Sequence, residues 1–153
     1  MDRIDKRILH FLQRDCRQPI AELANRVGLS PSACHRRVKH LEKEGVIAGY
    51  VAQLNRKKLG YSMEFFVEIS LSSQAEETLR AFEDAVRLVP EILECHLMSG
   101  NADYLVRIAP TDPDAFERIH RERLSRLPGV TKIQSSLVLR SIQTWAGYPV
   151  PGD

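Results

Sequence analysis

The chain has 153 residues, of which 43% are hydrophobic and 27% are charged, the balance of one ordinary soluble domain or of two small ones. This composition excludes a disordered chain, a collagen-like repeat and a disulfide-stapled miniprotein. The longest run of apolar residues and glycine spans only residues 45–52, whereas a membrane span needs about 20 residues. The three cysteines have neither metal-ligand nor disulfide-framework spacing, and the N-terminus is too charged for a signal peptide. We therefore expect a cytoplasmic protein with reduced thiols and no membrane partner.

Charge is divided unevenly along the chain. Residues 1–60 carry 13 Lys and Arg against 6 Asp and Glu, a net charge of +7, whereas residues 61–153 carry a net charge of −5. A basic segment joined to an acidic one indicates a polyanion-binding module tethered to a second module. The alternative is that solvated surface charge is clustered by chance.

Three helices are predicted in the basic segment, over residues 3–14, 20–27 and 31–44. Asp2 is placed as the N-cap of the first helix, and Ser30 as the N-cap of the third, which has proline at its first position. Gly28 can adopt the left-handed conformation that ends the second helix. Two helices joined through residues 28–30 predict a helix-turn-helix.

The outer face of the third predicted helix is polar and basic, which favours binding of double-stranded DNA. Its candidate DNA-binding residues are Ser30, Ser32, His35, Arg36, Arg37, Lys39, His40 and Lys43. The first turn of a recognition helix enters the major groove, so Ser32, His35 and Arg36 are expected to reach base edges. The later residues, with Arg37 close to that face, are expected to meet phosphates. An isolated basic helix is more often a solvated face, but this one follows a helix-turn-helix turn in the basic half.

The acidic half reads as a repeated strand–helix–strand pattern. Strands are predicted over residues 61–71, 92–98, 104–108 and 130–140, with helices over 73–89 and 113–127. Ser73 is expected to open the first of these helices in a capping box and Pro90 to end it. The order β-α-β-β-α-β predicts a ferredoxin-like α+β domain, one antiparallel sheet with both helices on one face. The other face needs a cover, and a second copy of the chain is the simplest one, so at least a dimer is expected.

These elements define four segments. They are a helix-turn-helix domain with the start of a β-linker over 1–52, a linker over 53–60, the βαββαβ domain over 61–143 and a tail over 144–153. Residues 46–53 are β-rich, which is the basis for the β-linker.

Several segments resemble the Lrp/AsnC family, the leucine-responsive or feast/famine transcription regulators. They are residues 5–9, 29–32, 37–38, 41–47, 94–105 and 127–130. The resemblance implies a DNA-binding, nucleoid-associated regulator with no catalytic role and no cofactor. It also implies dimers formed through the C-terminal sheets, further assembly into tetramers or octamers, and control by a small molecule, commonly an amino acid.

The resemblance further implies an effector site in the loop between the second and third predicted strands. The family carries a G-x-x-D signature there, which Gly100 and Asp103 match. Glycine lets backbone amides approach a carboxylate, and an aspartate can pair with an α-ammonium group. The alternative is that Gly100 makes the hairpin turn and Asp103 caps it. Many relatives have an acidic residue where this chain has Asn101. The weaker candidates, for which ordinary packing is the alternative, are Met98, Ser99, Ala102, Tyr104, Gln134, Ser135 and Ser136.

The sequence leaves three other functions to compare with this one. RNA recognition by a βαββαβ domain needs paired aromatic residues on a basic sheet, but the third strand offers only Tyr104 in an acidic half. Catalysis lacks a motif, since His35 and His40 are five residues apart and cannot ligate one metal as an i, i+4 pair would. The remaining alternative is an effector-independent, DNA-organising regulator of the same fold.

Overall fold

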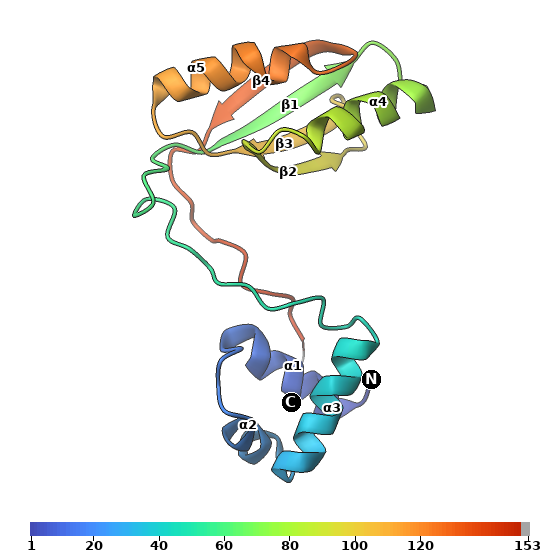
Figure 1. Cartoon of the computed structure of the whole chain (residues 1–153), viewed down its shortest axis with the longest axis vertical. Coiled ribbons are helices and arrows are strands. Elements are labelled where there is room, and N and C mark those ends of the chain that lie inside the picture. Colours follow the sequence, from blue (N-terminus) through green and yellow to red (C-terminus); the bar gives the residue numbers. More distant parts are fainter. Residues whose placement is uncertain (151–153) are drawn as a thin grey trace. The chain divides into compact units, whose positions relative to one another are not determined.

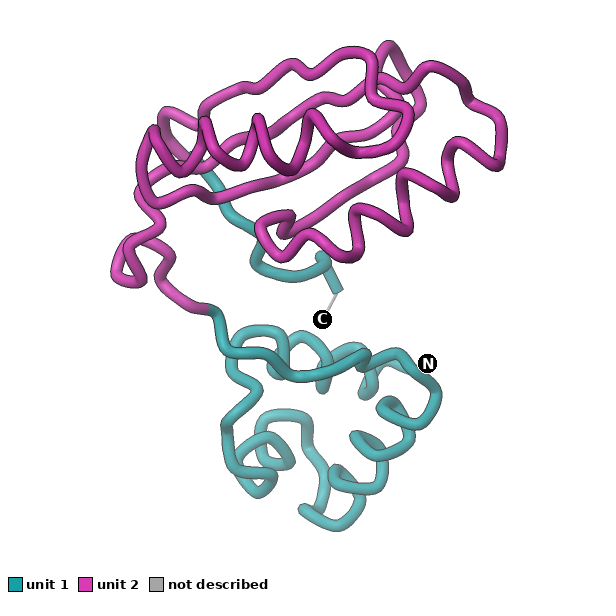
Figure 2. The backbone as a smooth tube through the Cα atoms, turned by 45° about the horizontal axis from the view of Figure 1, so that its top comes forward, with its two compact units in different colours: residues 1–53, 142–153 teal, residues 54–141 magenta. Residues whose placement is uncertain are grey.

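The computed structural model describes residues 1–150 and divides the chain into two compact units (Figure 2). The first unit comprises residues 1–53 and 142–153, and the second comprises residues 54–141. Residues 142–150 therefore belong with the N-terminal helices although they follow the second unit in the sequence. No helix in the described part of the chain is long and apolar enough to cross a membrane.

The first unit contains the three predicted helices (Figure 1), α1 (Arg3–Arg14), α2 (Ile20–Val27) and α3 (Pro31–Lys43). Asp2 and Asp5 form a reciprocal capping box at the start of α1, each carboxylate accepting the other residue's backbone N–H at 2.9 Å. Gly28 ends α2 in the left-handed region at φ 74°, and the Ser30 side chain caps α3 by accepting from the Ala33 N–H. The local signals for these three helices are confirmed.

One apolar cluster holds the three helices together. Ile8 of α1, Ala24 of α2 and Cys34 of α3 are fully buried in it, and the absence of a large side chain at Ala24 lets neighbouring helices approach closely. Burial raises the pKa of the Cys34 thiol. The exposed surface of α3 is thus fixed by packing on its opposite side.

The second unit is a four-stranded antiparallel sheet in the order β2-β3-β1-β4. The strands are β1 (Phe65–Leu71), β2 (Ile92–Leu97), β3 (Tyr104–Ile108) and β4 (Val130–Leu137). The helices α4 (Glu76–Val86) and α5 (Pro113–Glu122) lie together on one face of the sheet (Figure 1), and a short 3₁₀ turn, η1 (Leu124–Arg126), follows α5. This is the ferredoxin-like arrangement that the sequence predicts.

The two faces of this sheet differ in character. Phe65, Val67 and Ile69 of β1 point to the helices and are buried. The intervening residues Phe66 and Glu68 lie on the opposite face and are exposed, and no other element of the second unit covers that side. We call this side the open face.

Several predicted boundaries are wrong for identifiable reasons. Residues 46–53 hold no strand, because a strand needs a hydrogen-bonded neighbour and the described chain supplies none there. Helix α4 begins after Ala75 without a side-chain cap, since the Ser73 hydroxyl accepts from the Ala75 N–H at 3.0 Å instead. It also ends at Val86, before Pro90.

The remaining corrections concern element length. Helix α5 stops at Glu122, where the chain tightens into η1 instead of continuing to residue 127. Strand β1 begins at Phe65 and not at residue 61, and β2 ends at Leu97. Strand β4 ends at Leu137, three residues before the predicted end. The continuous pairing register ends at these residues, and only single backbone hydrogen bonds, such as that from the Val138 N–H to the Glu64 carbonyl, continue beyond them.

Candidate DNA-binding and effector sites

Most candidate DNA-binding residues share the exposed side of α3. Ser32, His35 and Arg36 are exposed on its first two turns, and the hydroxyls of Ser30 and Ser32 lie 3.2 Å apart at its start. The exposed residues of the later turns are Lys39, His40 and Lys43. The first-turn amides of α3 also carry the positive end of the helix dipole, which favours an anion such as phosphate.

Arg37 is the exception among these candidates. Its Nη1 atom donates to the Asp2 carboxylate at 2.7 Å and to the Asp5 carboxylate at 2.8 Å. The hydrogen bond that Arg37 donates to Asp5 is the main cause that raises the pKa of the Arg37 guanidinium. This contact joins α3 to the start of α1, and the two carboxylates next to the guanidinium oppose the approach of a phosphate to Arg37.

A second polar contact follows the exposed side of α3. The Lys39 ammonium donates to Glu42 at 2.7 Å, and the Tyr50 hydroxyl donates to the other Glu42 oxygen at 3.0 Å. Burial, followed by this hydrogen bond, raises the pKa of Tyr50 to about 12. The sequence analysis did not identify Glu42 and Tyr50 as partners. The signal was present, because Glu42 follows Lys39 by three residues on the same helix and precedes Tyr50 by eight residues.

The loop between β2 and β3 is held by Asp103. Its backbone N–H donates to the Ile69 carbonyl at 3.0 Å. One carboxylate oxygen accepts from the Leu71 N–H at 2.7 Å and the other from the Gln74 side-chain amide at 2.8 Å. Asp103 therefore fastens this loop to the end of β1 and to the segment before α4. Gln74 was missed because it lies 29 residues from its partner.

The other effector candidates fall into three places. Met98, Ser99, Gly100 and Asn101 are exposed in the loop itself, with Ala102 half-buried beside them. Gln134 and Ser136 lie on the open face, opposite Glu68 and Phe66 of β1. The structure thus brings the loop residues together, whereas the β4 residues belong to the strand at the opposite edge of the sheet from β2.

Two candidates, Tyr104 and Ser135, point toward the helices instead. Tyr104 is 1% exposed, packs its ring against Phe82 and donates its hydroxyl to Glu83 at 2.9 Å. Burial is the main cause that raises its pKa. The Ser135 hydroxyl is also buried, without a hydrogen-bond partner among the described residues. Tyr104 is therefore packed between the sheet and α4 and does not line an open effector pocket.

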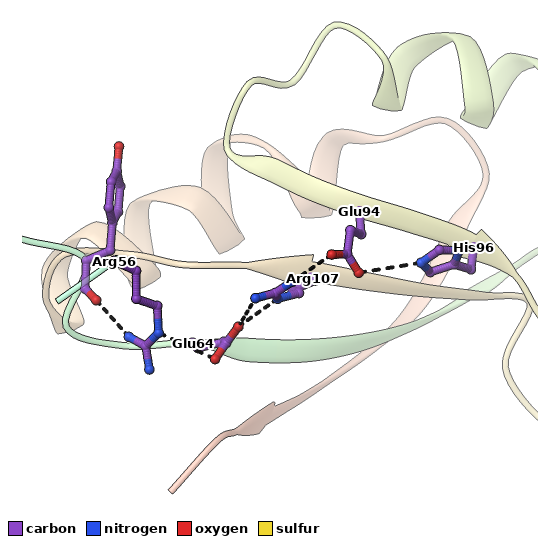
Figure 3. A network of polar contacts seen from close by, with 6 residues as sticks. Arg56, Glu64, Glu94, His96 and Arg107 are labelled. Carbon is purple, nitrogen blue, oxygen red and sulfur yellow. Dashed lines mark hydrogen bonds and ion pairs between the residues drawn. The ribbon is translucent and has the colours of Figure 1, made fainter. Parts of the chain in front are cut away.

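The open face carries a charged network that the sequence reasoning did not single out (Figure 3). Arg107 of β3 lies between Glu64 and Glu94, with 2.6 Å to each carboxylate. Arg56 approaches Glu64 from the other side at 3.5 Å, and His96 lies 3.6 Å from Glu94. Glu64 is buried, and its two arginine partners offset the cost of that burial. The pairing of β1, β2 and β3 brings Glu64, Arg107 and Glu94 together, and Arg56 reaches Glu64 from the linker.

No group of three His, Cys, Asp or Glu side chains within residues 1–150 is arranged to hold a metal ion.

Comparisons with known proteins agree with this architecture. The AsnC-type helix-turn-helix domain family matches residues 1–42, and the Lrp/AsnC ligand binding domain family matches residues 64–144. The leucine-responsive regulatory proteins of Klebsiella pneumoniae and Escherichia coli K12 are each 43% identical over 143 residues, which is 94% of this chain and 87% of each relative.

Solved structures give the same result. A transcriptional regulator from Neisseria meningitidis, solved as a complex with L-Met, has a TM-score of 0.92 at 36% identity, covering 97% of this chain and 96% of that one. An AsnC family regulator from Agrobacterium tumefaciens has a TM-score of 0.91 at 34% identity, covering 97% of both chains. The chain therefore belongs to the Lrp/AsnC family of transcription regulators, which join a DNA-binding helix-turn-helix domain to a ligand-binding domain and are not enzymes.

Proposed function

We propose that this regulator reads DNA through the first turns of α3 and that an amino acid bound near the β2–β3 loop changes its DNA affinity or its assembly. The observation that carries the DNA-binding half is the exposure of Ser32, His35 and Arg36 on a helix whose other side is packed. The net charge of +7 in residues 1–60 supports the same surface.

Within this interface we assign different roles to the arginines and lysines. Arg36 is exposed at the end that enters the groove, so it is proposed to contact a base edge, whereas Lys39, His40 and Lys43 contact phosphates. Arg37, held by Asp2 and Asp5, positions α3 instead of contacting DNA.

Two substitutions separate base reading from phosphate contact. Arg36→Ala is expected to relax sequence preference, because a bidentate arginine–guanine contact supplies about 1–3 kcal/mol of discrimination. Lys39→Ala is expected to weaken binding to all sequences alike and to reduce its salt dependence. Both are measured by titrating the variants against a duplex enriched by the wild-type protein from a random library, and against a scrambled duplex. Equal loss of preference in both variants contradicts the assignment.

The names of similar proteins support an amino-acid effector. The Neisseria regulator was solved with L-Met, and the curated relatives are named leucine-responsive. In this chain the exposed residues 98–101 form a loop whose position is set by Asp103. The space beside Gly100 is open, because a Cβ atom added to this glycine would have no neighbour within 4 Å. A ligand carboxylate therefore has room to approach the backbone amides there.

A thermal-stability screen against the twenty amino acids tests the effector proposal. A ligand at about 100 times its Kd stabilises by roughly 2.7 kcal/mol, which raises Tm by several degrees. The response is expected to fall in Asp103→Asn, which removes the charge but keeps an acceptor. Gln74→Ala is the matched control, because it removes one hydrogen bond of the same carboxylate and leaves its charge.

One observation favours the alternative of an effector-independent regulator. Both Asp103 oxygens already accept hydrogen bonds from Leu71 and Gln74, which is what a purely structural cap would do. A flat screen with unchanged DNA binding supports this alternative and rejects the effector proposal.

We also propose that two copies associate through the open face, that dimers assemble further, and that the regulator works in the cytoplasm on the nucleoid. The half-apolar character of the open face supports association, since Phe66 is 40% exposed there. Association pairs two recognition helices, as a two-fold symmetric operator requires.

A further inference from the structure

The chain crosses between its two units twice, once at residues 53–54 and again at residues 141–142. After β4 it leaves the second unit, and residues 142–150 join the helices of the first unit (Figure 1). We call residues 142–150 the C-terminal strap. Because β4 and the strap are covalently continuous, the ligand-binding domain is connected to the DNA-binding unit by a second route besides the linker.

The strap is held by a reciprocal pair of hydrogen bonds to α1. The Gln13 side-chain amide donates to the Tyr148 carbonyl at 3.1 Å, and the Tyr148 N–H donates to the Gln13 side-chain oxygen at 2.7 Å. Val150 packs against the apolar cluster of the three helices. The glutamine side chain thus pairs with the strap backbone as a neighbouring strand would.

Gly147 permits this close approach. Its φ is +100°, a conformation that L side chains rarely adopt, and an added side-chain carbon would lie 2.3 Å from the Gln13 side-chain oxygen. A residue other than glycine would therefore strain the backbone and displace Gln13 from its hydrogen bonds.

The contact is small and incompletely packed. A hollow of about 300 Å³ remains between the strap and α1, lined by His10, Gln13, Arg14 and strap residues. Trp145 stacks edge-on against Tyr148 and is 68% exposed. Few buried apolar contacts and exposed backbone hydrogen bonds are the properties of a segment that opens locally at low cost.

We propose that the C-terminal strap is a releasable connection through which a structural change at β4 alters the orientation of α3. The route runs from β4 through the strap to Gln13 at the end of α1, and from Asp2 and Asp5 at the start of α1 to Arg37 of α3. A shift of α1 then moves the recognition helix through the Arg37 contact. This inference rests on the proposed effector response, because it states how that response reaches the DNA-binding surface.

Trp145 is the only tryptophan of the chain, so its fluorescence reports strap docking without a label. In the full-length protein we expect time-resolved anisotropy to show Trp145 moving with the folded unit. Gly147→Ala and Gln13→Ala should both give Trp145 additional fast local motion, since each removes the reciprocal hydrogen bonds. Gly49→Ala is the matched control, because nothing lies within 4 Å of the added carbon. Unchanged anisotropy in both variants overturns strap docking and leaves the effector proposal intact.

The coupling itself is measured as the fold-change in DNA affinity when L-methionine or L-leucine is added. The probe DNA is a duplex enriched by the wild-type protein from a random library. The wild type and Gly49→Ala should respond equally, by about fivefold or more. Gly147→Ala and Gln13→Ala should bind the amino acid, as judged by thermal shift, and yet change DNA affinity by a factor near one.

The outcomes separate the two proposals. If all four proteins show the same fold-change, the strap carries no signal and the inference is overturned, whereas the effector proposal stands. If the wild type responds to none of the twenty amino acids, the effector proposal fails, and the role of the strap in regulation fails with it.

Discussion

Arg37 illustrates how one residue on a recognition helix can serve the fold and not the ligand. Its helix position is close to the DNA-facing side, but its guanidinium contacts two carboxylates of α1. The Asp5 side chain is only 12% exposed, so its charge depends on this partner in a partly buried place. The contact therefore helps to determine the orientation of α3 on α1.

Replacement of Arg37 by methionine keeps the aliphatic stem and removes the charge. Arg37→Met is expected to lower the free energy of unfolding by about 1–3 kcal/mol, because the Asp5 carboxylate is left buried without its partner. Lys39→Met is the control, since the exposed Lys39–Glu42 pair contributes less than about 1 kcal/mol. Urea denaturation compares the two. An equal loss of unfolding free energy in both variants would show that Arg37 is an ordinary surface residue. Arg37 would then again be a candidate for phosphate contact.

At the scale of single elements, local chemistry decides what a sequence can reveal. The predicted caps at Asp2 and Ser30 are confirmed, and a third cap of the same kind lies at Asp112. In each case the side-chain oxygen accepts a hydrogen bond from the backbone amide three residues later, so the signal is local. The capping box at Ser73 is equally local, but the chain closes a tighter turn to Ala75 and begins the helix later. Local patterns therefore predict an element, but they misplace its end where the chain makes a different local turn, as it does before α4.

Elements and sites that depend on distant partners were not predictable in this way. Residues 46–53 have strand-like composition but form no strand, because strand formation needs a neighbour that local pattern cannot supply. The hydrogen bond from Gln74 to Asp103 and the Glu64–Arg107–Glu94 network were not predictable for the same reason. Their members are distant in the sequence, and those of the network meet only through strand pairing. The resemblance indicated Gly100 and Asp103, whereas only the structure gives the partners of Asp103.

The N-cap of α5 predicts a pH dependence of stability. The Asp112 carboxylate accepts from the Ala115 N–H at 2.7 Å and from the Thr111 hydroxyl at 2.8 Å. The bond from Ala115 is the main cause that lowers the pKa of Asp112 in the folded state. Because the pKa of Asp112 is lower in the folded state than in the unfolded state, the ionised carboxylate stabilises the fold at pH values above the unfolded pKa of about 3.9. This stabilisation is lost as the pH falls through the folded pKa.

Asp112→Asn keeps a capping side chain that does not titrate. Below about pH 4 the wild type should therefore lose stability more steeply than the variant, and the curves should converge once Asp112 is protonated. Guanidinium denaturation at a series of pH values from 7 to 2 measures both. Parallel curves throughout would show that the Asp112 charge contributes nothing to capping.

At the scale of the whole molecule, the open face of the sheet combines two kinds of surface. Its charged side chains already form ion pairs within one chain, whereas part of its apolar surface is uncovered. Arg107 has both of its carboxylate partners within the second unit. Phe66, between Arg107 and Ser136 in the strand pairing, remains exposed. A face of this kind gains from a second copy mainly by covering Phe66 and its apolar neighbours, because the ion pairs are already formed.

Phe66→Glu should therefore weaken association by at least about tenfold, since it removes the exposed aromatic ring and places a carboxylate that is costly to bury in the interface. Leu88→Glu is the matched control, because Leu88 is 82% exposed after α4 and away from the open face. Sedimentation velocity over a range of concentrations measures both variants. Because a two-fold operator needs two linked recognition helices, Phe66→Glu should also lose DNA affinity, and the loss should be smaller at protein concentrations that restore the dimer. A Phe66→Glu protein that sediments as the wild type does would place the self-association surface elsewhere on the chain, and its DNA affinity should then be unchanged as well.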